Sequence, residues 1–314
     1  MSTMKAVRIH NYGPTSTLTY EEVAKPRAGE GEILIRNFAT SVNPFDCAVR
    51  AGYVTGWYTY GFPLTLGLDI SGIVEEVGAG ANHFVPGDAV WARSDPALNG
   101  AYAEFVSVSA SEIAAKPKSL DHVDAAALPH VGVTAWRVLV DTANLTEGQS
   151  VLIHAAAGGV GSFAVQLAKA RGAKVIGTAS TANLDFLSAL GADEIIDYTK
   201  TRFEDVVHDV DVVMDNVGGE TQERSWAVLK PGGILISIVQ PPSEETAAKY
   251  GVRQQFAGGY PPVGPVLADI AAMVDAGKIK PIIATVHPLS EVGKAHELVE
   301  AHHTRGKQIV QIAD

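Results

Sequence analysis

The sequence contains one glycine-rich turn, Ala156-Ala157-Gly158-Gly159-Val160-Gly161, between an apolar run and a segment with helical periodicity. The turn approximates the G-x-G-x-x-G fingerprint that holds dinucleotide phosphates, with alanine at the first glycine position. Gly158 allows the backbone to approach a pyrophosphate, and Gly161 allows the helix to pack closely on the strand. The first N–H groups of the helix add a partial positive charge. We therefore predict a cofactor site formed by Ala157, Gly158, Gly159, Val160 and Gly161. The alternative is a tight strand-to-helix turn that binds nothing.

The end of the next predicted strand bears on which nucleotide the turn would hold. In NAD sites, an acidic residue about 20 positions after the fingerprint binds the ribose 2′-hydroxyl. The sequence there is Thr178-Ala179-Ser180-Thr181, and the first acid is Asp185. Because no carboxylate repels a 2′-phosphate, this segment favours NADP(H), with Ser180 as a contact. Ser180 is also a suitable N-cap for the following helix, and the two roles are compatible.

Two regions of different character must position these residues. Residues 1–120 read as short strands separated by Gly/Pro turns, for example at 4–10 and 31–43, which predicts a compact barrel-like domain. After residue 121 a helical segment leads into alternating strands and helices. The strands are predicted at 150–156, 173–180, 192–198, 210–219 and 232–239, with helices at 161–172, 181–191 and 266–281. This alternation predicts an α/β fold with a doubly wound parallel sheet.

Length and composition exclude several classes of function. A chain of 314 residues suits about two domains. The net charge of −11, without a basic cluster, argues against a nucleic-acid partner. Cys47 is the only cysteine, so an intramolecular disulfide and a multi-cysteine zinc site are excluded, and a reducing, cytoplasmic location is expected. We expect no signal peptide and no membrane span, because the sequence has no sufficiently long apolar run.

Several segments together resemble the zinc-independent quinone oxidoreductases of the medium-chain dehydrogenase/reductase superfamily. They are "VNPFDCAVRAGY", "LGLDISGIVEEVGAGANHFVPGDAVWA", "HAAAGGVGSFAVQLAKARGAKVIGTAS", "LGADEIIDY" and "GKQIV". The resemblance spans nearly the whole chain, in the order of the family. It implies a GroES-like catalytic β-barrel domain at 1–122 and 285–314, a Rossmann domain at 123–284, and an active site in the cleft between them.

The resemblance also permits a position-by-position test for zinc. Zinc alcohol dehydrogenases of the superfamily place Cys where this chain has Asn43, and Gly-His-Glu where it has Gly67-Leu68-Asp69. Leucine cannot ligate zinc, and asparagine is a poor ligand for it. We therefore predict no metal.

Without zinc, polarisation of the acceptor would depend on hydrogen-bond donors. The resemblance points to Asn43, Asp46 and Tyr53 as catalytic residues. An Asn amide or a Tyr hydroxyl donates to a developing oxyanion, whereas Asp46 would orient its neighbours or cap a loop. Tyr53 opens an aromatic loop, 53–60, whose other rings either stack on a flat acceptor or, as we favour, pack together.

The resemblance assigns further cofactor contacts outside the glycine-rich turn. Thr134 would lie near the nicotinamide, Tyr198 near the adenosine phosphate, and Asn216 at a strand end that faces the cofactor. No Lys or Arg adjoins Ser180, and Arg305 and Lys307 would instead supply the positive charge that binds the 2′-phosphate. The alternative for both is ordinary surface charge.

These features predict an NADPH-dependent enzyme that transfers hydride to a quinone or to the activated C=C of an enone. A zinc-free carbonyl reductase acting on ketones or aldehydes is the second possibility, and a non-catalytic NADPH-binding sensor is the third. We expect a small-molecule substrate and a homodimer formed through an edge strand. "GGILISIVQPP" is the candidate edge strand, with a buried central strand as the alternative.

Overall fold

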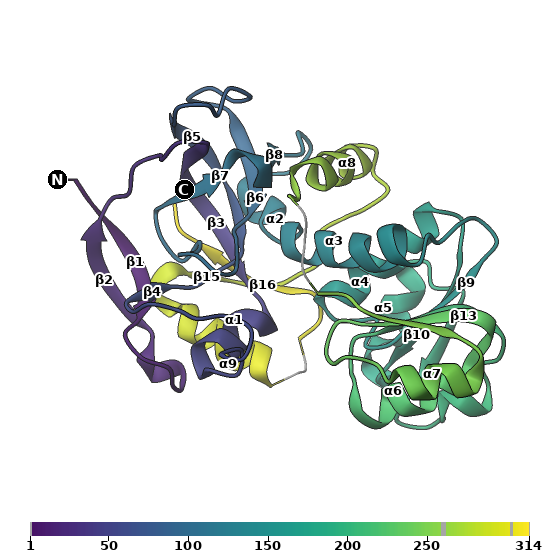
Figure 1. Cartoon of the computed structure of the whole chain (residues 1–314). Helices are drawn as coiled ribbons and strands as arrows, with labels where there is room; N and C mark the ends of the chain where they lie inside the picture. The colour runs from purple at the N-terminus through teal and green to yellow at the C-terminus, as the bar shows by residue number, and fades with distance from the viewer. Residues whose placement is uncertain (1, 259–261, 302–303, 314) are drawn as a thin grey trace. The chain divides into compact units, whose positions relative to one another are not determined.

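The computed structural model describes residues 2–258, 262–301 and 304–313. The chain forms two compact units (Figure 1). Unit 1 comprises Met1–His130, Pro261–Ala276 and Pro281–Asp314, and unit 2 comprises Val131–Tyr260 and Gly277–Lys280. This grouping differs from the ranges read from the sequence, because the late helix α8 (Gly264–Asp275) packs on strands of unit 1.

Unit 1 is built from two sheets within its described residues. A three-stranded antiparallel sheet has the order β2-β1-β4, and a seven-stranded sheet has the order β15-β16-β3-β5-β6-β8, with β7 on β3. The strands are β1 (Thr3–Ile9), β2 (Thr19–Ala24), β3 (Glu32–Val42), β4 (Leu64–Thr65), β5 (Asp69–Val77), β6 (Ala89–Arg93), β7 (Phe105–Ser109), β8 (Ile113–Ala115), β15 (Ile283–Pro288) and β16 (Lys307–Gln311). Their buried aliphatic side chains, such as Ile33, Ile70 and Val90, form the core.

Short helices cover this β-rich unit. They are α1 (Pro44–Ala51), α2 (His122–Ala125), α8 and α9 (Val292–Glu300), and α9 packs on α1 and β16. Helix α1 begins at a capping box between Asn43 and Asp46, with Pro44 at its first turn. It ends at Gly52, whose φ of 82° is left-handed. Local sequence therefore fixes both ends of this helix.

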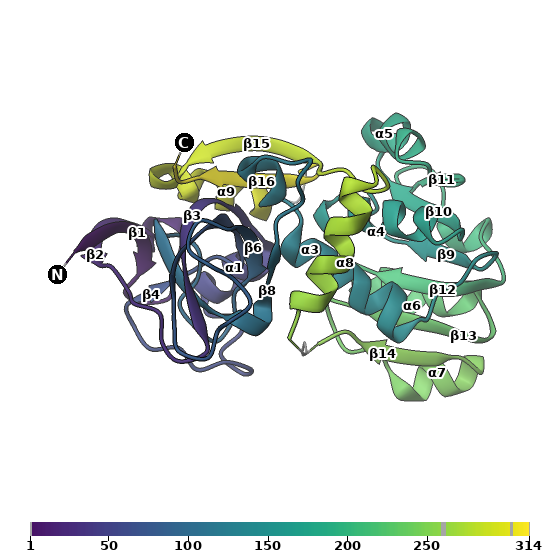
Figure 2. The same ribbon diagram turned by 90° about the horizontal axis from the view of Figure 1, so that it is seen from above.

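Unit 2 is a parallel sheet in the Rossmann arrangement. Its order is β11-β10-β9-β12-β13-β14 across the described residues, and Figure 2 shows the strands in this succession. The strands are β9 (Ser150–Ile153), β10 (Lys174–Ala179), β11 (Glu194–Asp197), β12 (Val210–Asp215), β13 (Leu229–Ser237) and β14 (Arg253–Phe256). The helices are α4 (Gly159–Ala170), α5 (Leu184–Ala189), α6 (Gly219–Ser225) and α7 (Glu244–Tyr250). The strand order reverses between β9 and β12, which is where such sheets bind ligands.

A helical segment connects the two units along the chain. Helix α3 (Pro129–Trp136) continues as a π-helical stretch, Arg137–Thr142. The helical segment predicted after residue 121 is confirmed, and it is divided at Pro129, since α2 ends before this proline and α3 begins there.

The alternation of strands and helices predicted for unit 2 is also confirmed, but several short elements were missed. These are β2, β4, β14, β15, α1, α6 and α7. The segment "GGILISIVQPP" is not itself an edge strand, although it lies next to the outermost strand β14. It forms much of β13, which pairs with β12 on one side and β14 on the other, so its apolar character reflects central burial. No helix in the described residues is long and apolar enough to cross a membrane.

Candidate active site

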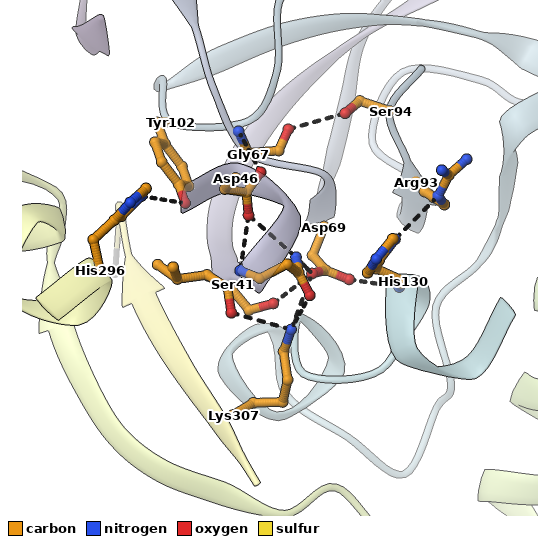
Figure 3. A network of polar contacts seen from close by, with 12 residues as sticks. Ser41, Asp46, Gly67, Asp69, Arg93, Ser94, Tyr102, His130, His296 and Lys307 are labelled. Atoms are coloured by element: carbon orange, nitrogen blue, oxygen red, sulfur yellow. Dashed lines mark hydrogen bonds and ion pairs between the residues drawn. The ribbon is translucent and has the colours of Figure 1, made fainter. Parts of the chain in front are cut away.

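Five polar side chains meet in the interior of unit 1, and we call them the buried polar cluster (Figure 3). They come from four elements that the sheet brings together. Strand β3 pairs with both β5 and β16, so the first residues of those two strands reach the same place. The members are Ser41 on β3, Asn43 and Asp46 at the start of α1, Asp69 on β5 and Lys307 on β16.

Asn43 is at the centre of the cluster. Its Nδ2 donates to Asp69 Oδ2 at 2.8 Å and to Asp46 Oδ2 at 3.3 Å. Its Oδ1 accepts a hydrogen bond from Lys307 Nζ. Both N–H groups of Nδ2 and one lone pair of Oδ1 are thus engaged in hydrogen bonds inside the protein. This corrects the prediction that Asn43 donates to a substrate oxyanion: it holds the cluster together.

Asp46 performs both roles that the sequence left open. Its carboxylate accepts from the backbone N–H of Asn43 at 2.8 Å, which caps α1, and from the N–H of Gly67 at 3.2 Å, which fixes the loop before β5. Burial raises the pKa of Asp46 to about 7, and the nearby charge of Asp69 adds to this increase. The N–H of Asn43 opposes the increase in pKa.

Asp69 and Lys307 form a buried ion pair. The Nζ–Oδ2 distance is 3.6 Å, and the two side chains are 0% and 6% exposed. Burial alone would raise the pKa of Asp69, but the Lys307 ammonium and the hydrogen bonds from Ser41 and Asn43 hold it below its ordinary value. The Asp69 Oδ1 atom also accepts from the N–H of His130 at 2.7 Å. Burial lowers the pKa of Lys307, and the carboxylates of Asp69 and Asp46 oppose that effect.

The position of Lys307 overturns one prediction. Its ammonium is enclosed in unit 1 and bonded to Asn43, Asp69 and the carbonyl of Val42. It is therefore not a 2′-phosphate partner. Arg305, the other predicted partner, is exposed just before β16, and its role stays a prediction.

Tyr53 and the aromatic loop lie directly after α1. Tyr53 is 85% exposed, so its hydroxyl faces solvent in unit 1. Tyr58 and Tyr60 do pack together, with ring centroids 6.0 Å apart, and the Tyr60 hydroxyl donates to Pro96 O at 2.8 Å. Trp57 is 65% exposed.

The positions compared with zinc enzymes have other partners here. Asn43 and Asp69 bind Lys307, and Leu68 is buried in the core. Within residues 2–258, 262–301 and 304–313, no group of three or more His, Cys, Asp or Glu side chains could hold a metal ion.

The glycine-rich turn of unit 2 has the close packing that the fingerprint requires. Helix α4 begins at Gly159, and Gly158 is its N-cap. A Cβ on Gly161 would lie 2.3 Å from Ala155 O and 2.7 Å from Ala156 Cα, so only glycine allows this approach of helix to turn. The first N–H groups of a helix have no acceptor within it. These groups, beside a turn without side-chain bulk, fit the phosphates of a dinucleotide.

Asn216 borders the same edge of the sheet, directly after β12. Its Nδ2 donates to His154 O at 2.8 Å, and its buried Oδ1 has no hydrogen-bond partner among the described residues. An unused buried acceptor fits a donor supplied by a bound cofactor. His154 itself is a packing residue, because its ring nitrogens lie 3.2 Å from Thr178 Oγ1 and 2.9 Å from Ser225 Oγ.

The predicted adenosine contacts also lie together. The N–H of Tyr198 donates to Ala179 O at 3.1 Å, which brings the chain after β11 beside Ser180 at the end of β10. The hydroxyl of Ser180 accepts from Asn183 Nδ2 at 3.2 Å. Thr134 is buried in α3.

Sequence reasoning missed one carboxylate here, Asp197. It pairs in register with Ala179, so an acid does lie beside the end of β10, although it is distant along the chain. The usable signal was strand adjacency: in the predicted doubly wound sheet, the strand after β10 ends at the same edge.

Comparison with known proteins agrees with both units. The model for an alcohol dehydrogenase GroES-like domain matches residues 29–118, and that for a zinc-binding dehydrogenase matches residues 190–310. The mouse mitochondrial NAD(P)H oxidoreductase RTN4IP1 is 38% identical, over 90% of this chain and 82% of its own length. The chloroplastic NADPH-dependent alkenal/one oxidoreductase of Arabidopsis thaliana is 35% identical, over 98% and 79%.

Solved structures extend the comparison. The quinone oxidoreductase of Coxiella burnetii has a TM-score of 0.90 at 34% identity and covers 99% of this chain and 100% of its own. The Escherichia coli quinone oxidoreductase complexed with NADPH has a TM-score of 0.88 at 28% identity, with 99% and 100% covered.

A GroES-like unit with a buried polar cluster, joined to a Rossmann unit with a glycine-rich turn, defines a medium-chain dehydrogenase/reductase, a class of oxidoreductases. Within this class the chain belongs to the quinone oxidoreductase family. The predicted fold class is confirmed.

Proposed function

We propose that this enzyme transfers a hydride from NADPH to a quinone or to the activated C=C bond of an enone. The structural observation that carries the proposal is the close approach of α4 to its turn at Gly161, which leaves a cradle for a pyrophosphate. The names of the relatives support the acceptor class, and the NADPH complex of the Escherichia coli enzyme supports the nucleotide.

The cofactor supplies the hydride, and the chain must bind and orient it. We assign the phosphates to the turn from Ala157 to Gly161. Asn216 Oδ1 is available to accept from the nicotinamide portion, and Ser180 and Tyr198 lie where the adenosine portion would extend. Thr134 and Arg305 keep their predicted roles near the nicotinamide and the 2′-phosphate.

Within unit 1, Tyr53 is the residue we assign to the acceptor. Its exposed hydroxyl is able to donate to the oxygen that gains negative charge during hydride transfer. Asn43 and Asp46 are positioning residues, because they fix the start of α1, and Tyr53 follows the end of that helix.

The test of function is NADPH oxidation with a panel of acceptors in the presence of a chelator. The panel is a benzoquinone, a cyclic enone, a simple ketone and a no-acceptor control, with NADH in parallel. Turnover of quinone or enone with NADPH is the expected result. Turnover of the ketone alone would establish the carbonyl reductase instead, and NADPH binding without turnover would point to the sensor.

The role of Tyr53 has its own test. Tyr53→Phe removes the hydroxyl and keeps the ring, and we expect kcat to fall by about a hundredfold or more, which is the usual range for loss of one catalytic donor. Tyr20→Phe, at an exposed tyrosine on β2, is the matched control and should leave kcat unchanged. Equal rates for the two variants would remove Tyr53 from the mechanism.

Three further expectations belong to this proposal: independence of zinc, a homodimer and a cytoplasmic location. The Lys307 contacts of Asn43 and Asp69 support the first, and the outer position of β14 in its sheet offers an edge for the second. The single, buried cysteine supports a reducing compartment. Retention of activity after chelation, analytical ultracentrifugation and cell fractionation test the three in turn.

A further inference from the structure

The carboxyl ends of β10 and β11 form a small polar platform that the proposed NADPH site does not yet explain. Ser180 follows β10, and Asp197 closes β11. Ligands of such sheets bind at this edge. A carboxylate at the end of the second strand, β10 in this chain, normally selects NAD, since it binds the ribose 2′-hydroxyl and repels a 2′-phosphate. Asp197 ends the neighbouring strand β11, where it pairs in register with Ala179 at the end of β10. The negative charge of Asp197 is therefore at odds with a preference for NADPH, which carries a 2′-phosphate.

The hydrogen bonds of Asp197 resolve the conflict. Its side chain is only 10% exposed, and its oxygens accept from Thr199 N at 3.0 Å, from Thr199 Oγ1 at 2.6 Å and from Thr181 Oγ1. These bonds occupy the lone pairs that a ribose hydroxyl would need. Asp197 is thus turned into the protein and serves as an internal anchor.

The same carboxylate holds a cation. Lys200 Nζ lies 3.3 Å from Asp197 Oδ2, and the Lys200 side chain is 65% exposed. The same carboxylate accepts a hydrogen bond from Thr181 Oγ1. Asp197 thus links the Lys200 ammonium to the segment that begins with Ser180. Its contact with Asp197 neutralises the charge that would repel a phosphate.

Other cations near this edge are engaged differently. Arg202, the next one along the chain, binds Glu204 through both Nε at 2.9 Å and Nη2 at 2.7 Å. Lys174 lies at the opposite end of β10, where it pairs with Glu194 at 2.6 Å. Lys200, in contrast, is an exposed cation in the same turn as Tyr198, next to the segment that begins with Ser180.

We propose that Lys200 is a specificity-determining cation that binds the 2′-phosphate of NADPH, in addition to the role predicted for Arg305, with Asp197 as the residue that positions Lys200. The proposal rests on the proposed function and deepens it. Lys200 supplies, from the turn after β11, the positive charge that the sequence lacks next to Ser180 and that the enclosed Lys307 does not provide.

The test is nucleotide binding by titration calorimetry, which needs no turnover. For Lys200→Met we expect the Kd of NADP⁺ to rise about tenfold, as one charge-assisted contact is lost, while the Kd of NAD⁺ stays the same. Lys200→Arg should keep the wild-type preference. Lys174→Met is the matched control, since it removes an exposed, carboxylate-paired lysine from the opposite end of the neighbouring strand β10, and it should change neither Kd.

The outcomes separate this assignment from the proposed function. If Lys200→Met weakened the binding of NADP⁺ and NAD⁺ equally, or weakened neither, the role of Lys200 would be overturned. The proposed function would still stand if the wild type has NADPH-dependent activity. If the wild-type protein binds neither nucleotide, the proposed function fails and the role of Lys200 falls with it. If Lys174→Met lost as much affinity for NADP⁺ as Lys200→Met, the effect would be one of general surface charge, and the assignment of Lys200 would be overturned.

Discussion

The ammonium of Lys307 and the carboxylate of Asp69 lie 3.6 Å apart in the interior of unit 1, each at the first residue of its strand. Strand β3 pairs with both strands and so brings the two charges together. Isolated buried charges are costly, and a buried pair is stable only while both partners are present. This relationship makes the cluster sensitive to single substitutions.

We predict that Lys307→Met destabilises the protein by about 3–5 kcal/mol, because it leaves Asp69 charged and buried without its partner. Urea unfolding measures the change. Lys5→Met, which breaks an exposed pair with Glu22, is the control, and it should cost no more than about 1 kcal/mol. Similar losses for the two variants would mean that the buried pair contributes no more than a surface pair.

The raised pKa of Asp46 predicts a specific dependence of stability on pH. The pKa rises from an ordinary 3.8 to about 7 on folding, so the folded state binds this proton more tightly than the unfolded state. The associated stability is fully present below about pH 4 and is lost as the pH rises through about 7.

Asp46→Asn removes this titration and keeps the shape of the side chain. The unfolding free energy of wild type minus that of Asp46→Asn should fall between about pH 4 and pH 7, by at most about 1.4 kcal/mol per pH unit, and then level off. Taking the difference cancels the buried histidines, whose pKa values are lowered. A difference that rises with pH would contradict the assignment.

Two glycines of the α4 turn should respond differently to alanine. Gly161→Ala places a Cβ against the backbone of Ala155 and Ala156, and we expect a loss of about 1–3 kcal/mol, as is typical of overpacking. At Gly158 the nearest atom to an added Cβ is 3.4 Å away, so the fold should tolerate Gly158→Ala within about 1 kcal/mol.

Gly158→Ala should instead weaken NADPH binding by about tenfold, because the methyl group occupies the cradle. Thermal unfolding and fluorescence titration with NADPH separate the two effects. Unchanged NADPH affinity in Gly158→Ala would exclude the turn as the pyrophosphate site.

Cys47 should be unreactive in the native protein. Its thiol is buried 3.3 Å from His296 Nδ1, and burial raises its pKa strongly, so almost no thiolate forms at neutral pH. An aromatic disulfide reagent should modify the native protein at least about a hundredfold more slowly than the urea-unfolded chain. Comparable rates would show that the site opens readily in the native state.

The sequence predicts local motifs well and contacts between residues far apart in the chain poorly. The turn around Gly158 and Gly161 is recognisable because strand, glycines and helix are contiguous. The capping box of Asn43 and Asp46 was equally local, as an N-P-x-D start, although the helix it begins was not predicted. Lys307 was misassigned because its partners are more than 230 residues away, and only the pairing of β16 with β3 reveals them.

Asp197 illustrates the same limit over a shorter span. Its effect on cofactor choice depends on the register with Ala179 and on three hydrogen bonds that no linear pattern encodes. The fold class follows from periodicity, whereas the electrostatics of the site follow from strand pairing.

The membership of β16 in unit 1 also has a consequence for biosynthesis. The ribosome makes β3 and β5 well before β16, so Asp69 and Asn43 must wait for Lys307 while more than 200 intervening residues are translated. The parallel sheet of unit 2 is complete in sequence well before then and is free to fold first. During that interval the part of β3 that pairs with β16 is an unpaired strand edge and the Asp69 carboxylate lacks its ammonium partner, so we expect the nascent chain to need protection from association until β16 is in place.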